Sequence, residues 1–165
     1  MPFDYEANTL AVANTLTNAN TTTATVDLSS GLTTRVRNIY RSDPAIVGLR
    51  GDIYPAVFVR VNRKEEEFAG LGATGPAGAR KQATVSYDVI GFYRKDGGRQ
   101  SQADVLVELE RFAENIEGVF QQETTLSGTA MWCQVKQTDF YGPFQNDESW
   151  IKAIVCSLDA RYHFR

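Results

Sequence analysis

The stretch KQATVSYDVIGFYRKDGGRQSQADVLVELERFAENIEGVFQ, residues 81–121, decides the fold class. Its first part alternates apolar and polar side chains, which predicts a long strand over residues 81–94. Ser101 and Asp104 then form an S-x-x-D helix-capping signature, and apolar residues follow at helical spacing as far as Phe120. We therefore expect a strand, a tight turn and an amphipathic helix of about 20 residues that covers one face of a sheet.

Three more strands are predicted around this unit. YPAVFVRV, residues 54–61, precedes it, and AMWCQVKQTDFY, residues 130–141, follows it. The last strand, WIKAIVCSLDARYHFR at 150–165, has the clearest alternation of one apolar and one polar face. The sequence thus predicts an α+β fold in which two hairpins form a four-stranded antiparallel sheet, covered on one face by the helix of 101–121.

The N-terminal part has a different composition. Residues 1–30 are rich in Ala, Asn and Thr, which predicts a flexible arm, because so little apolar surface cannot offset the entropy lost on ordering. A helix over residues 5–16 is the competing interpretation. SSGLTTRVRNIYR, residues 29–41, has the spacing of a short amphipathic helix, and residues 31–165 are expected to form a single domain.

A long connection is predicted between the first two strands. A charged run leads into FAGLGATGPAGAR, residues 68–80, which holds four glycines and a proline. We expect a mobile loop at about 63–80, and the glycines serve either chain flexibility alone or contact with a partner.

Charge is distributed unevenly along the 165 residues. The first 34 residues contain three acidic and no basic side chains, which equals the whole net charge of −3. The remainder is neutral and has no basic block, so the sequence gives little support for nucleic-acid binding. No apolar run is long enough to span a bilayer, and the opening residues lack the pattern of a signal peptide, so we expect no membrane partner.

Residues that carry chemistry are scarce. His163 is the only histidine, and Cys133 and Cys156 are the only cysteines. Both cysteines fall on the apolar faces of predicted strands, which favours buried free thiols. The acidic side chains of the helix fit a solvated face better than a catalytic pair. We therefore predict no catalytic residues, no metal ligands and no cofactor, and hence a protein that is not an enzyme.

The order of helix, two strands, long helix and two strands resembles that of the tail terminator, or tail completion, proteins of long-tailed bacteriophages. The resemblance rests on YPAVFVRV, FAENIEGVFQ and IVCSLDARYHF, and it covers residues 30–165. The arm of about 30 residues and the extended loop at 63–80 depart from the smallest members of that family.

The resemblance implies a virion structural protein, assembled in the cytoplasm of a host bacterium. It implies a ring of six copies that caps the tail tube on the capsid side, ends tube polymerisation and joins the head connector or stopper protein. Genomic DNA would pass through such a ring without specific binding. Two alternatives stay open: another neck protein (a stopper or an adaptor), and a small α+β ligand-binding or enzyme domain.

Subunit or partner contacts are predicted where apolar side chains lack an evident place in the core. Five residues in the glycine-rich loop and around the last hairpin meet this criterion: Phe68, Leu71, Phe140, Tyr141 and Phe144. The alternative is that these side chains fold back over the edge of the sheet.

Overall fold

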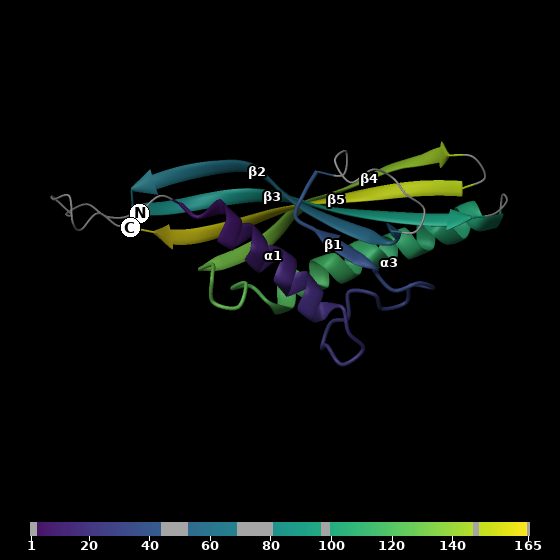
Figure 1. Ribbon diagram of the computed structural model, residues 1–165, viewed down its shortest axis with the longest axis horizontal. Coiled ribbons are helices and arrows are strands. Elements are labelled where there is room, and N and C mark those ends of the chain that lie inside the picture. The colour runs from purple at the N-terminus through teal and green to yellow at the C-terminus, as the bar shows by residue number, and fades with distance from the viewer. Residues whose placement is uncertain (1–2, 44–52, 69–80, 97–99, 147–148, 165) are drawn as a thin grey trace.

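The computed structural model describes residues 3–43, 53–68, 81–96, 100–146 and 149–164. Its elements follow the order α1 (Tyr5–Ala19), β1 (Asn38–Tyr40), β2 (Ala56–Phe68), β3 (Lys81–Asp96), α3 (Gln100–Gln122), β4 (Trp132–Asn146) and β5 (Ser149–Phe164). The strands form one sheet in the order β1-β2-β3-β5-β4, in which only β1 and β2 are parallel (Figure 1).

The prediction of a four-stranded antiparallel sheet covered by one long helix is wrong. The structure is α+β with a five-stranded mixed sheet and two helices. The additional strand, β1, lies within residues 29–41, where a helix was predicted, and it pairs with residues 56–58 of β2. Helical spacing in a short segment cannot reveal that the edge of β2 offers hydrogen-bond partners, so the tertiary pairing overrides the local pattern.

Residues 5–19 were predicted to belong to a flexible arm, but they form the helix α1. The competing interpretation, a helix over residues 5–16, agrees with this. The Asp4 side chain caps the helix by accepting a hydrogen bond of 2.9 Å from the Ala7 N–H. Val12 and Leu16 are fully buried against the rest of the protein. The low mean hydropathy of the segment concealed this stripe, which is narrow but lies on one side of the helix.

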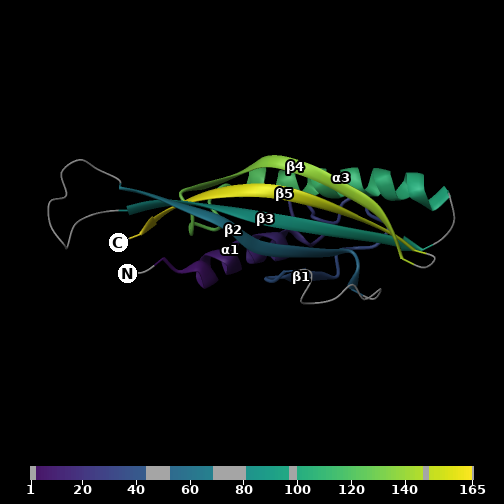
Figure 2. The same ribbon diagram turned by 90° about the horizontal axis from the view of Figure 1, so that it is seen from above.

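Both helices pack on the same face of the sheet. The inner stripe of α3 is buried in the main core together with alternate residues of β3 and β5; its members are Val105, Leu109, Phe112, Ile116 and Phe120. Figure 2 shows α3 on the β4 side of the sheet and α1 on the β2 side. A smaller cluster on the opposite face centres on Phe58, whose ring stacks on Tyr40 of β1 at 5.0 Å between centroids.

β2 is longer than predicted. Residues 63–68, which were expected to begin a mobile loop, continue the strand and pair with residues 81–86 of β3. The charged side chains still alternate between the two faces, and the backbone ladder with β3 continues the strand. The remainder of the predicted loop, residues 69–80, lies outside the described part of the chain.

Candidate subunit interface

One long edge of the sheet is formed by β4. We call the backbone side of residues 134–141 that faces away from β5 the β4 edge; among the described residues no strand pairs with it, whereas just before it the N–H of Cys133 donates to the Thr124 carbonyl at 2.6 Å. Such an edge presents N–H and C=O groups that can pair with another chain. The β4 edge is therefore the first candidate for a contact surface.

A groove of about 700 Å³ runs between this edge and α3. Its lining comprises Glu117, Phe120, Gln121, Thr124 and residues 132–138. The hydroxyl of Thr138 donates to the Glu117 carboxylate, which fastens β4 to the helix beside the groove. Lys136 extends over the Trp132 ring, with 5.7 Å from its Nζ to the ring centroid. Polar and apolar groups thus line the groove in similar measure.

Two of the predicted contact residues lie at the far end of the β4 edge. Phe140 and Tyr141 are 52% and 49% exposed, so neither folds back into the core. The register places Phe140 opposite Ile154 on the helix-covered face and Tyr141 opposite Ala153 on the other face. Large aromatic side chains on both faces of an unpaired edge form an apolar surface suited to a contact.

The other three predicted contact residues are only partly placed. Phe68 belongs to the end of β2 by its backbone, and Phe144 belongs to β4 opposite Ile151. Leu71 lies outside the described residues. The five residues therefore do not form one surface in the described part of the chain. Only Phe140 and Tyr141 have exposed side chains that are described, and these lie on opposite faces of the same edge.

Irregular positions divide the β4 edge. The register shifts between Val135 and Gln137, and again between Tyr141 and Phe144. The second shift contains Gly142, whose φ is +99°, and Pro143, which has no N–H to donate. The regular pairing surface of β4 therefore ends at Tyr141.

The opposite side of the sheet has a second unpaired stretch. Among the residues that the structure describes, β1 pairs with β2 only at residues 56–58, and we call the remaining backbone side of residues 59–68 the β2 edge. A groove of about 480 Å³ separates it from α1, with a lining that includes Tyr5, Val59 and Val61. Sequence analysis missed this edge because its charged run was interpreted as the start of a loop.

Ion pairs of alternating sign follow the β2 edge. Arg63 pairs with Glu65 at 3.1 Å, and Lys64 pairs with Glu66. The Lys64 ammonium group lowers the pKa of the Glu66 carboxyl, and the pKa of Lys64 is raised in turn, chiefly by the hydrogen bond to Glu66. These pairs lie at the surface, where each contributes little to stability and can be exchanged for other partners.

A ligand-binding domain, the alternative left open above, would need free polar groups, but three polar residues in the middle of the sheet, Tyr87, Asp88 and Asp159, are engaged within the protein. Tyr87 is buried, with its hydroxyl 3.0 Å from that of Tyr162. Asp88 accepts hydrogen bonds from Arg60 and Asn62, and Asp159 accepts one of 2.7 Å from Ser86. None of these three residues lines the grooves described above.

Two arginines and a tyrosine that nucleic-acid binding could use, Arg60, Arg161 and Tyr93, are also paired within the protein. Arg60 forms ion pairs with Asp43 and Asp88, and Arg161 forms one of 3.0 Å with Glu67. The hydroxyl of Tyr93 donates to Glu108. This neutralisation leaves little net positive potential at these positions.

The two cysteines are free and buried, as predicted. Desolvation raises the pKa of Cys133 to about 12 and that of Cys156 to about 11, so both stay protonated at neutral pH. His163 is exposed on β5. Within the described residues no three His, Cys, Asp or Glu side chains are grouped as metal ligands, and no helix could span a membrane.

The chain matches no protein-family model and no curated protein.

Proposed function

We propose that the protein is a structural component of a bacteriophage virion, and that six copies form a ring at the capsid-proximal end of the tail. The observation that carries the proposal is the pair of edges, β4 and β2, at opposite sides of one sheet, with which no strand in the described part of the chain pairs. A closed ring repeats one heterologous contact, so each copy needs two different surfaces that fit each other.

Three further features support this role. The helix α3 stands between the two long hairpins, as in the family that the sequence resembles. The exposed aromatic residues Phe140 and Tyr141 lie on one of the two edges. The cationic side chains Arg60 and Arg161 are neutralised by carboxylates, which suits a ring that lets genomic DNA pass without holding it.

In this role the ring ends polymerisation of the tail tube and presents its other side to the head connector or stopper protein. Its partners are further copies of the chain, the tube protein and the connector, and its place is the virion after assembly in the bacterial cytoplasm. Because the work consists of contacts between proteins, it requires no catalytic group.

Electron microscopy of assembled tails, with the chain carrying a visible label, tests the proposal. We expect label at the capsid-proximal end in a ring, and sedimentation of the concentrated protein is expected to reveal species above the monomer. Label at the neck but above the tail end would favour a stopper or adaptor. A chain that is monomeric at every concentration and absent from virions would refute a structural role.

A further inference from the structure

We infer that the contact between neighbouring copies is a strand pairing, in which residues 134–141 on the β4 edge of one copy align antiparallel with residues 61–68 on the β2 edge of the next. This inference rests on the ring assembly proposed above and names the surfaces that would form it. Four observations on the described residues support the pairing.

Strand direction is the first observation. The ladders β2 to β3, β3 to β5 and β5 to β4 are all antiparallel, so β2 and β4 run in opposite directions. When a second copy stands beside the first in the same orientation, as rotation about a ring axis requires, its β4 runs antiparallel to β2. The alternation of the sheet then continues from one copy to the next without a break.

Charge is the second observation. In the alignment of 61–68 with 134–141, Arg63 stands opposite Asp139. The ladders place Arg63 level with Ser86, and Asp139 level with Val155 and Ile90, all on the face away from the helices. The two residues therefore carry opposite charges on a shared face.

Shape is the third observation. Phe140 is exposed on the helix-covered face of β4. In the alignment it stands beside Val61 of the next copy, at the groove between α1 and β2 that is lined by Tyr5, Val59 and Val61. An aromatic side chain that lacks a place in its own core thus meets a partly apolar groove of the neighbour, which is the usual arrangement at the centre of an interface.

The blocked positions are the fourth observation. β1 covers β2 at residues 56–58, and the irregular Gly142–Pro143 segment ends the regular part of β4. The alignment avoids both, because with Asn62 as the extra residue of the β2 register shift Val61 falls opposite Phe140, and β4 is used no further than Tyr141. Within one copy Arg63 is level with Gln134 and Asp159, and Asp139 is level with Val155, so pairing Arg63 with Asp139 displaces the next copy by four residues of β5, about 13 Å at ~3.3 Å per residue. Across four strand spacings of ~4.8 Å this gives a tilt of about 35°, within the range of closed sheets.

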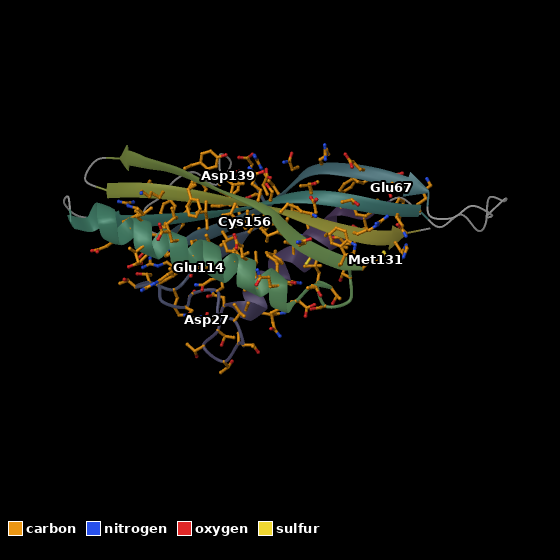
Figure 3. All side chains as sticks on the ribbon, turned by 180° about the vertical axis from the view of Figure 1, so that it is seen from behind. Asp27, Glu67, Glu114, Met131, Asp139 and Cys156 are labelled. Carbon is orange, nitrogen blue, oxygen red and sulfur yellow. The ribbon has the colours of Figure 1, made fainter. Side chains whose placement is uncertain are left out.

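Cysteine cross-linking tests the alignment directly. Residues opposite each other in an antiparallel pair have Cα atoms about 4.5 to 5.5 Å apart, which a disulfide can bridge. We expect the double variant Arg63→Cys with Asp139→Cys to give a ladder of disulfide-linked multimers up to six copies on oxidation. The matched control, Arg63→Cys with Glu114→Cys, is expected to give none, since Glu114 is exposed on α3 away from both edges (Figure 3). The wild-type chain provides a second control because its own thiols are buried.

A charge exchange tests the same pair of residues. Arg63→Asp and Asp139→Arg are each expected to weaken association between copies by about fivefold to tenfold, and the combined variant is expected to restore it. Glu114→Lys is the control and is expected to change nothing. Rescue by the combined variant distinguishes a direct pairing from a general effect of charge.

The two proposals fail in different ways. If the chain forms rings in assembled tails but R63C/D139C gives no cross-link there, and the charge exchange gives no rescue, the strand pairing is wrong and the ring stands. If the chain is monomeric and absent from virions, both proposals fall.

Discussion

The hydroxyl of Tyr93 donates a hydrogen bond to the buried carboxylate of Glu108, and so ties the end of β3 to the first half of α3. The same carboxylate accepts hydrogen bonds from the backbone N–H and the hydroxyl of Thr33. Glu108 is only 7% exposed. A side chain that the sequence places on a polar helix face is therefore the point where three segments of the chain meet.

We expect Glu108→Ala to destabilise the protein by about 2 to 4 kcal/mol, because the hydroxyls of Tyr93 and Thr33 lose their acceptor. Urea unfolding followed by circular dichroism measures the change. Glu110→Ala, at an exposed position of the same helix, is expected to stay within about 0.5 kcal/mol of the wild type. Equal effects of the two substitutions would mean that the buried hydrogen bonds contribute nothing.

Gly91 allows α3 to approach the sheet closely. A Cβ atom built at this position would lie 2.9 Å from Ile154 Cγ1 and 2.9 Å from Phe112 Cε1. We expect Gly91→Ala to cost about 1 to 3 kcal/mol of stability through overpacking. Adding Phe112→Leu, which removes the ring, is expected to cost less than the two single changes combined. Strict additivity in this cycle of unfolding measurements would contradict the close contact.

The helix α1 is expected to contribute to the stability of the whole domain. Leu16→Ala removes a fully buried side chain and is predicted to cost about 2 to 4 kcal/mol, while Leu10→Ala, at an exposed position, should change stability little. Thermal unfolding of both variants gives the comparison. If residues 1–30 were a flexible arm, Leu16→Ala would also have no effect.

The strands and the long helix were predictable because their patterns repeat over many residues. The alternation in residues 81–94 and the stripe from Val105 to Phe120 each depend on local spacing, and the structure places these residues in β3 and α3. Phe140 and Tyr141 could be proposed as contact residues because they lie by the last hairpin connection, where apolar side chains lack an evident place in the core.

Other features depend on contacts between distant segments, which spacing does not encode. β1 exists because its three residues pair with the edge of β2 at residues 56–58. α1 is fixed by the burial of Val12 and Leu16 in a segment whose average composition indicates disorder. The β2 edge was missed because charged residues that alternate between two faces resemble a loop until the ladder with β3 is known.

The buried thiols predict a loss of stability at alkaline pH. Burial raises the pKa of Cys133 to about 12 and that of Cys156 to about 11, from an ordinary value of 9.0. Between pH 9 and 11 the unfolded chain releases thiol protons that the folded chain keeps, so the free energy of unfolding falls as the pH rises. At one pH unit above the ordinary value, the two thiols together are expected to cost about 2 to 3 kcal/mol.

Urea midpoints measured from pH 8 to pH 10 test this prediction, with the variant Cys133→Ala/Cys156→Ala as the control. The substitutions lower stability at every pH by removing buried atoms, so the slope with pH is compared and not the absolute value. We expect the wild-type curve to fall more steeply than that of the variant above pH 9, and the two to run parallel below it. Parallel curves over the whole range would show that the thiols ionise as readily in the folded chain as in the unfolded one.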